Sequence, residues 1–193
     1  MKSASVNENV KEASGIRGRL HFTNYALETP RAFEIAAILE TAHDMASEVY
    51  DRLVAELKSI CATREYQVDN LVVLTGRAVF ARRLVGDLTY TGTVNYGALG
   101  TSTSAVASGN TQLGTEVARK LFARRTRTNA QVSFDFFYSK SDTDGTYEEF
   151  GMFIDGTSTA NSGQLFNRAL TGGWTKTNNE AMTVSVTVDI NDA

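Results

Sequence analysis

The most regular hydrophobic pattern in the chain lies near its end, where apolar and polar residues alternate one by one. Met182, Val184, Val186, Val188 and Ile190 occupy every second position, and Thr, Ser and Asp residues fill the positions between them. Because successive side chains of a β-strand point to opposite faces, this alternation predicts a strand with one buried face.

Shorter strand-like segments separated by turn residues precede this strand. They cover residues 71–84, 94–99, 115–127, 132–138, 146–154 and 164–170. Asp144-Gly145 and Asp155-Gly156 follow two of these segments and are typical of tight turns, since Gly readily adopts the positive φ angles that such turns need. Short strands with turns between them predict a mainly β fold over residues 70–193, an antiparallel β-sandwich of the jelly-roll-like kind.

Residues 30–66 show a helical pattern instead. Thr29-Pro30 is a favourable helix start, because Thr supplies an N-cap oxygen and Pro lacks only an N–H group that would be unpaired at this position. Residues 31–66 contain neither Gly nor Pro, and their apolar residues recur at spacings of three and four. This segment is therefore predicted to form a long helix, or two consecutive helices, in front of the β domain.

A seven-residue repeat within the helical segment marks a candidate interface. Its members are Leu39, Ala46, Leu53 and Ile60, with Val49 between them. This spacing is that of a coiled-coil seam, so these residues are predicted to mediate oligomerisation or docking. Glu56 interrupts the seam, and packing of the same helix face against the chain's own β domain is the alternative.

Residues 1–29 are rich in Ser, Asn, Glu and Lys and are predicted to form a flexible arm that orders on a partner. Leu20, Phe22 and Tyr25 alternate within it, which would suit a short strand added to a neighbour's sheet. The arm lacks the apolar run of a signal peptide, and no stretch reaches about 18 apolar residues, so no membrane association is expected. The single cysteine, Cys61, cannot form an intrachain disulfide, which favours synthesis in a reducing compartment.

Charge is distributed unevenly, although the formal net charge is only −3. Residues 71–130 contain eight basic and two acidic residues, whereas residues 131–193 contain three basic and nine acidic ones. Opposite charges on two parts of one domain suit contacts between copies, and two solvated faces are the alternative. Arg124, Arg125 and Arg127 are candidate docking residues. Aromatic residues are not interleaved with them, so ion pairs are expected here rather than a nucleic-acid interface.

Catalytic and metal-binding patterns are not found in the sequence. His21 and His43 have no second His or Cys at the spacing of metal ligands, and a Ser–His–Asp arrangement would require one of them. The acidic turn at residues 142–145 fails as a calcium loop, because Lys140 stands at the first ligand position. We therefore expect a protein that is not an enzyme and holds no cofactor or metal. Trp174 and Tyr96 are candidates for stacking on sugar rings, with packing in the core as the alternative.

Several motifs follow one another in the second half of the chain: NYGALGTST at residues 95–103, TQLGTE at 111–116, YEEFGMF at 147–153, QLFNR at 164–168 and WTK at 174–176. Their order resembles a β-sandwich module of tail-fibre, collar and baseplate-associated proteins of tailed bacteriophages. Two positions depart from the family pattern. Residues 101–103 lack a second Gly, and Asn110 replaces the usual acid.

The resemblance implies a structural component of a tailed-phage particle, located at the neck, collar, tail fibre or baseplate. It implies a β-sandwich that docks on other virion proteins, often as a homotrimer, and that resides in the virion after synthesis in the host cytoplasm. Two alternatives are a carbohydrate- or receptor-binding module at a fibre tip, which would contact a host surface glycan, and a capsid decoration protein.

Overall fold

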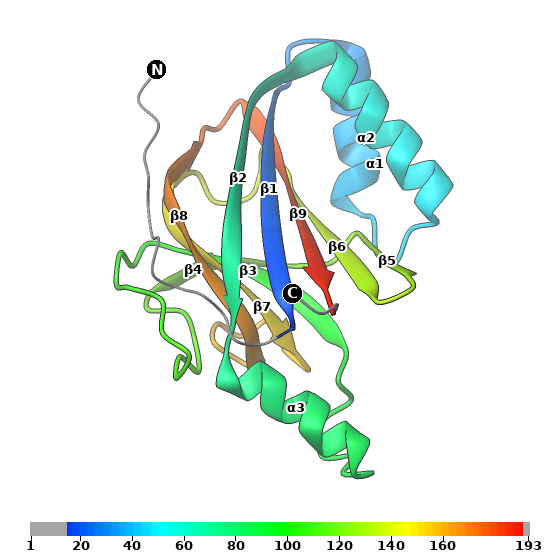
Figure 1. Ribbon diagram of the computed structural model, residues 1–193. Helices are drawn as coiled ribbons and strands as arrows, with labels where there is room; N and C mark the ends of the chain where they lie inside the picture. The colour runs from blue at the N-terminus through cyan, green and yellow to red at the C-terminus, as the bar shows by residue number, and fades with distance from the viewer. Residues whose placement is uncertain (1–14, 191–193) are drawn as a thin grey trace.

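Nine antiparallel strands form one sheet in the part of the chain that the computed structural model describes, residues 15–190. Their bounds are β1 Arg17–Ala26, β2 Ala62–Val72, β3 Val94–Gly100, β4 Glu116–Leu121, β5 Arg124–Thr128, β6 Gln131–Tyr138, β7 Gly145–Ile154, β8 Gln164–Lys176 and β9 Glu180–Asp189. They are arranged in the order β4-β3-β7-β8-β2-β1-β9-β6-β5, and the sheet curls so that its two halves face each other (Figure 1).

The interior of the curl holds the main hydrophobic core. The aromatic ring of Phe150 on β7 lies 6.2 Å from that of Phe22 on β1 and 5.8 Å from that of Phe136 on β6, so it joins the two halves of the sheet. On β9 the side chains of Met182, Val184, Val186 and Val188 are fully buried. The alternation therefore predicted this strand and its buried face correctly as far as Val188, whereas Ile190 lies beyond the strand and is 44% exposed.

The two halves of the sheet are connected at both ends. β2 and β8 pair through two positions only, Leu71 with Arg168 and Val72 with Asn167. At the opposite end, β4 continues almost directly into β5. The mainly β prediction is thus confirmed in its coarse form, as a single curled antiparallel sheet.

Residues 30–66 were predicted to be helical, as one long helix or two consecutive ones. The structure has two short helices here, α1 (Pro30–Glu40) and α2 (Ser47–Cys61), so the prediction of one long helix is wrong. The helix start was predicted correctly: the Thr29 side chain accepts a hydrogen bond of 3.2 Å from the N–H of Ala32. The two helices form a hairpin beside β9, β6 and β5 (Figure 1). Its apolar side forms a second core with residues of the sheet such as Tyr25 and Phe137.

The prediction of a flexible arm is wrong for residues 17–26, which form β1. This strand lies between β2 and β9 inside the sheet, and Leu20 and Phe22 are fully buried. Asn24 is also fully buried, and its side chain bonds the Trp174 indole N–H and the Thr175 carbonyl. The partner of this strand is thus the chain's own sheet rather than a neighbour's. The rest of the predicted arm, residues 1–14, lies outside the described residues.

The strand predicted at residues 71–84 is also wrong for most of its length. Only Leu71 and Val72 belong to a strand, the end of β2, and residues 74–84 form helix α3 (Leu74–Leu84). Gly76 allows α3 to approach β8 closely, since a Cβ atom at this position would lie 2.4 Å from the carbonyl oxygen of Phe166. Residues 62–66, predicted to be helical, form the first part of β2.

Two further strand boundaries differ from the prediction. The strand expected over residues 115–127 is divided into β4 and β5 by Phe122 and Ala123. Their N–H groups donate to the carbonyls of Asn95 and Asp135, which lie in opposite halves of the sheet. Conversely, the strand expected to end at residue 170 is longer in the structure, because β8 continues through Gly172 and Gly173. Both glycines adopt positive φ angles, close to a shift in the register between β7 and β8.

Candidate functional site

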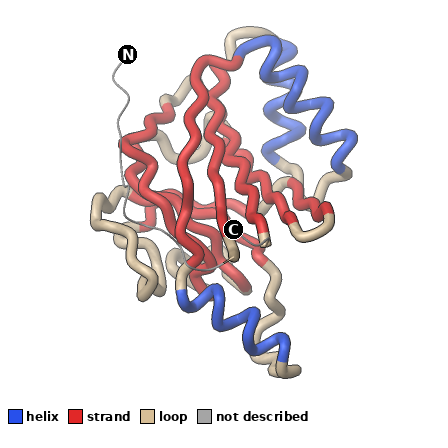
Figure 2. The backbone as a smooth tube through the Cα atoms, in the orientation of Figure 1, coloured by secondary structure: helices blue, strands red, loops and turns tan. Residues whose placement is uncertain are grey.

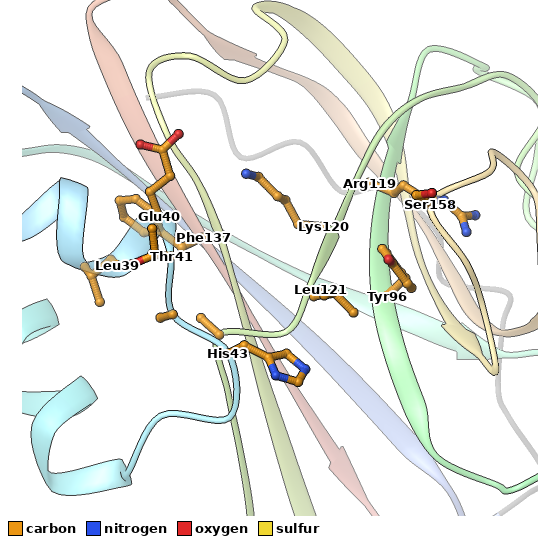
Figure 3. Close-up of a pocket in the computed structure, with 12 residues that line it drawn as sticks. Leu39, Glu40, Thr41, His43, Tyr96, Arg119, Lys120, Leu121, Phe137 and Ser158 are labelled. Carbon is orange, nitrogen blue, oxygen red and sulfur yellow. The ribbon is translucent and has the colours of Figure 1, made fainter.

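A shallow pocket of about 330 Å³ opens between the C-terminal end of α1 and strands β4 and β6, with Tyr96 of β3 at its rim (Figure 3). Its charged side chains already have partners within the chain. Glu40 accepts hydrogen bonds from the hydroxyls of Ser139 and Ser141. Lys120 lies 2.9 Å from Asp142, and Arg119 lies 2.5 Å from Glu116. The pocket therefore presents no free charged group aimed at a ligand.

Glu40 provides a pH-dependent link between α1 and the turn that joins β6 and β7. The hydroxyls of Ser141 and Ser139 lower the pKa of its carboxyl. A carboxyl with a lower pKa in the folded state stabilises the fold above its unfolded pKa of about 4.3, and this stabilisation is lost as the pH falls through the folded pKa.

Glu40→Gln is accordingly expected to lower the free energy of unfolding at neutral pH by up to about 1 kcal/mol, a small effect because Glu40 is exposed. The difference from the wild-type chain should shrink at about pH 3, where the wild-type carboxyl is protonated as well. Urea unfolding at the two pH values measures it. Ser141→Ala, which removes one of the donors, should change the pH dependence in the same direction. An unchanged pH dependence in both variants would contradict this role of Glu40.

Two of the three arginines of β5, Arg124 and Arg125, form ion pairs within the chain, as the sequence predicted. Arg124 lies 2.7 Å from Asp135 on β6 and 2.8 Å from Asp51 on α2. Arg125 lies 2.8 Å from Asp44 in the turn between α1 and α2, and Arg127 donates to the backbone carbonyl of its neighbour Asn129. These contacts attach the helical hairpin to the edge of the sheet. A docking role for the same arginines remains a prediction.

The structure does not bring the residues of the seven-residue repeat together as one seam, because the helix is interrupted at residues 41–46. Leu39 on α1 and Leu53 on α2 are buried in the core beneath the hairpin. Ala46 lies at the N-terminal end of α2 and is exposed, while Val49 and Ile60 are each 38% exposed. The alternative interpretation, packing of the apolar face on the chain's own sheet, is confirmed for Leu39 and Leu53.

The two aromatic residues predicted to stack on sugars lie apart and have partners. The Trp174 ring stacks on Tyr66 with 5.7 Å between ring centres, and the guanidinium of Arg64 lies 4.9 Å from the centre of the indole ring. Tyr96 lies at the pocket, with the Arg119 guanidinium 5.3 Å from its ring centre. In the sheet, Trp174 lies opposite Tyr147 of β7, and Tyr96 lies opposite Phe153 of β7. These two positions of β7 are six residues apart, so Trp174 and Tyr96 do not form one platform.

A buried ion pair that the sequence did not predict anchors the long loop between β3 and β4. Glu149 is fully buried, and its carboxylate lies 2.7 Å from Nε of Arg168, which is 2% exposed. The carboxylate also accepts hydrogen bonds from the backbone N–H groups of Ser102, Gly114 and Thr115.

Arg168 extends the same network to the middle of the loop. Its guanidinium donates to the carbonyl oxygens of Ser104 and Ala105 and to the side-chain oxygen of Asn110. A loop of this length inside a compact domain needs contacts that hold it in place. The chain itself supplies these contacts. The sequence signal for the network is weak, because β7 also contains Glu148 and β8 also contains Lys176.

Neither histidine lies in a catalytic or metal-binding arrangement. His21 lies 3.4 Å from Glu65 on the neighbouring strand, and the ring of His43 packs against Phe122. Within residues 15–190, no group of three or more His, Cys, Asp or Glu side chains is placed to hold a metal ion. In the same residues, no helix is long and apolar enough to cross a bilayer.

Exposed apolar side chains gather at the C-terminal end of α3 and in the loop that follows. Leu84, Val85 and Leu88 are 88%, 81% and 70% exposed, the highest values among the large exposed apolar residues of the described chain. The sequence did not indicate this surface, because the pattern of residues 71–84 predicted a strand. Large apolar side chains that are exposed next to one another are typical of a surface that binds another molecule.

Comparisons with known proteins do not identify this chain. No protein-family model matches the sequence, and neither the curated proteins nor the solved structures include a significant match. Inference about function therefore depends on the motifs and on the arrangement of the residues described above.

Proposed function

We propose that this chain is a non-catalytic structural component of a tailed-bacteriophage particle, which acts by forming homo-oligomers and by docking on other virion proteins. Its place would be the neck, collar, tail fibre or baseplate. The proposal combines the resemblance of the motifs in the second half of the chain with the contacts that these motifs make.

The observation that carries the proposal is that four of these motifs meet in one buried network. Glu149 belongs to YEEFGMF, Arg168 to QLFNR, the N–H group of Ser102 to NYGALGTST, and the N–H groups of Gly114 and Thr115 to TQLGTE. Asn110, which stands where the family has an acid, accepts a hydrogen bond of 3.0 Å from Arg168. An acid at this position would pair with the same guanidinium. The motifs therefore have a structural purpose, the anchoring of a long loop, as expected of a particle component rather than an enzyme.

A more specific description of the fold is part of the same proposal. The two facing halves of the curled sheet would correspond to the two layers of a jelly-roll-like β-sandwich. The contacts of Phe150 with Phe22 and Phe136 across the interior support this view, as does the pairing of β2 with β8 at only two positions. Trimers are the first expectation for the oligomer, because the resembling modules are often trimeric.

Light scattering on the purified full-length chain tests the proposal. We expect a discrete oligomer whose mass is a small multiple of 21.0 kDa, with three copies as the first expectation. Electron microscopy of phage particles carrying a tagged copy should then locate it at the neck, tail or baseplate. A monomer at every concentration, or absence from the particle, would contradict the proposal.

The alternative of a glycan-binding module at a fibre tip has less support. Tyr66, Phe22 and Arg64 lie around the Trp174 ring, and the indole N–H is bonded to Asn24. Tyr96 is the better of the two candidates because it lines an open pocket. Binding of the wild-type chain to a glycan array, and its loss in Tyr96→Ala, would favour this alternative.

A further inference from the structure

We infer that copies of this chain associate head to tail, with the end of α3 of one copy docking on the outer face of α1 of the next. This inference rests on the proposed self-assembly and adds its geometry. We call the first surface the α3 tip (Leu84, Val85 and Leu88 with Arg82 and Arg83) and the second the α1 face (Phe33, Glu34, Ala37 and Ile38 with Glu28). Both consist of apolar residues beside charged ones, and their charges are opposite.

The α3 tip projects from the sheet. The N-terminal part of α3 packs on β8 through Gly76 and through Phe80, whose ring meets Phe166 edge-on at 5.8 Å. Beyond this contact the helix extends outward to its exposed end (Figures 1 and 2). Within residues 82–88, Arg82 and Arg83 stand against Asp87, which lies 2.7 Å from Arg82, so the tip keeps a net positive charge beside its apolar side chains.

The α1 face is acidic and partly apolar. Phe33 and Ile38 are 41% and 45% exposed, and they lie on the side of α1 that points away from the buried residues Ile35 and Leu39. Residues 28–40 contain three carboxylates, Glu28, Glu34 and Glu40, and one arginine, Arg31, which contacts both Glu34 and Glu56.

Lys140 does not reverse the charge of the α1 face. Its ammonium lies 4.6 Å from the ring centre of Phe33 and adds one positive charge, so carboxylates still outnumber cations there. The α1 face is thus complementary to the α3 tip in charge, and each surface has large apolar side chains to cover. This complementarity favours a second copy of the chain as the partner.

The two surfaces lie at opposite ends of the molecule (Figure 1). A contact between different surfaces of identical chains is heterologous, so each copy donates one surface and accepts the other. Such contacts produce a closed ring when the successive rotations between copies add up to a full turn, and a filament otherwise. A trimeric ring of the kind proposed above is one of the closed forms.

Two complementary variants test the inference. Leu84→Asp with Val85→Asp places carboxylates on the α3 tip, and Glu34→Lys with Ile38→Lys places cations on the α1 face. All four side chains are exposed, so both variants should fold, which circular dichroism and thermal unfolding would verify. Thr111→Asp with Gln112→Glu is the matched control, because it adds two carboxylates at exposed positions in the loop between β3 and β4.

Sedimentation velocity should find that each variant alone self-associates more than about tenfold more weakly than the wild-type chain and the control. An equimolar mixture of the two variants should form a dimer with one copy of each, because the intact α3 tip of one variant can bind the intact α1 face of the other. Only a heterologous contact predicts this complementation.

Each other outcome overturns the inference in a different way. If the α3-tip variant still forms the wild-type oligomer, or the α1-face variant does, the contact lies elsewhere while the proposed function stands. If the mixture stays monomeric, the two surfaces do not bind each other. If the wild-type chain is itself monomeric at every concentration, the proposed self-assembly fails together with the inference.

Discussion

Arg168→Met is expected to lower the free energy of unfolding by about 3–5 kcal/mol, because it leaves the carboxylate of Glu149 buried without its cation. Glu149 is fully buried, and the Nε atom of Arg168, at 2.7 Å, is its partner in an ion pair. Backbone N–H groups of the loop would remain as its hydrogen-bond donors. They carry only partial charges and are held in place partly by Arg168 itself.

The same substitution should loosen the loop between β3 and β4 before the rest of the fold opens. The Arg168 guanidinium bonds the carbonyls of Ser104 and Ala105 and the side chain of Asn110, and all three contacts would be lost. Hydrogen exchange should therefore accelerate at the N–H groups of Ser102, Gly114 and Thr115, which donate to Glu149. Amide hydrogen exchange in β9, which is remote from this network, should change only as much as the global free energy of unfolding changes.

A double variant separates loss of the pair from loss of packing. Arg168→Met combined with Glu149→Gln removes both charges, so the double variant should be more stable than the sum of the two single effects predicts. Urea unfolding of the four proteins of this cycle measures the coupling. A loss below about 1 kcal/mol in Arg168→Met, or additive effects in the cycle, would contradict the importance assigned to this pair.

Phe150→Ala is expected to destabilise the fold by about 3–5 kcal/mol, through lost burial and the cavity left behind. Phe150 on β7 is fully buried, and its ring meets that of Phe22 edge-on, with 6.2 Å between ring centres. The ring of Phe136 lies 5.8 Å from it, and both partners belong to the other half of the sheet. The cavity would open between the two halves, where the backbone of the curled sheet can collapse little.

Phe33→Ala is the matched control for this prediction. It removes the same ring from a position that is 41% exposed on α1, and it should cost less than about 1 kcal/mol when measured in dilute solution. Urea unfolding followed by tryptophan fluorescence reports on both variants, since Trp174 packs against Phe22 in the same core. Equal losses for the two variants would mean that the interior of the curl is not the main source of stability.

Local signals in the sequence predicted several elements of the structure correctly. The alternation in residues 182–188 predicted β9, Asp144-Gly145 predicted the turn before β7, and Thr29-Pro30 predicted the start of α1. In each case neighbouring residues determine the outcome: a period of two, a glycine with freedom in φ, or an N-cap hydroxyl. The ion pairs of Arg124 and Arg125 were also expected, although their partners Asp135 and Asp44 could not be named.

Only the tertiary structure decided the state of β1, β2 and α3. Residues 17–26 are polar enough to suggest an arm, yet they pair with β9, so that Gly18 lies opposite Val188. Residues 62–66 continue the stretch without Gly or Pro that predicted a helix, but they form part of β2 because β1 offers a strand for pairing. In α3, Val79 and Phe80 favour a strand, and packing of the helix on β8 through Gly76 overrides that preference.

What the sequence by itself determined was therefore the β-rich class, the turn at Asp144-Gly145 and the absence of recognisable catalytic motifs. What only the tertiary structure decided was which charged residues are buried and which apolar ones are exposed. Glu149 and Arg168 are buried because the loop between β3 and β4 covers them, and Leu84 is exposed because α3 extends beyond β8. Contacts between residues far apart in the chain determine burial, and local composition carries little information about them.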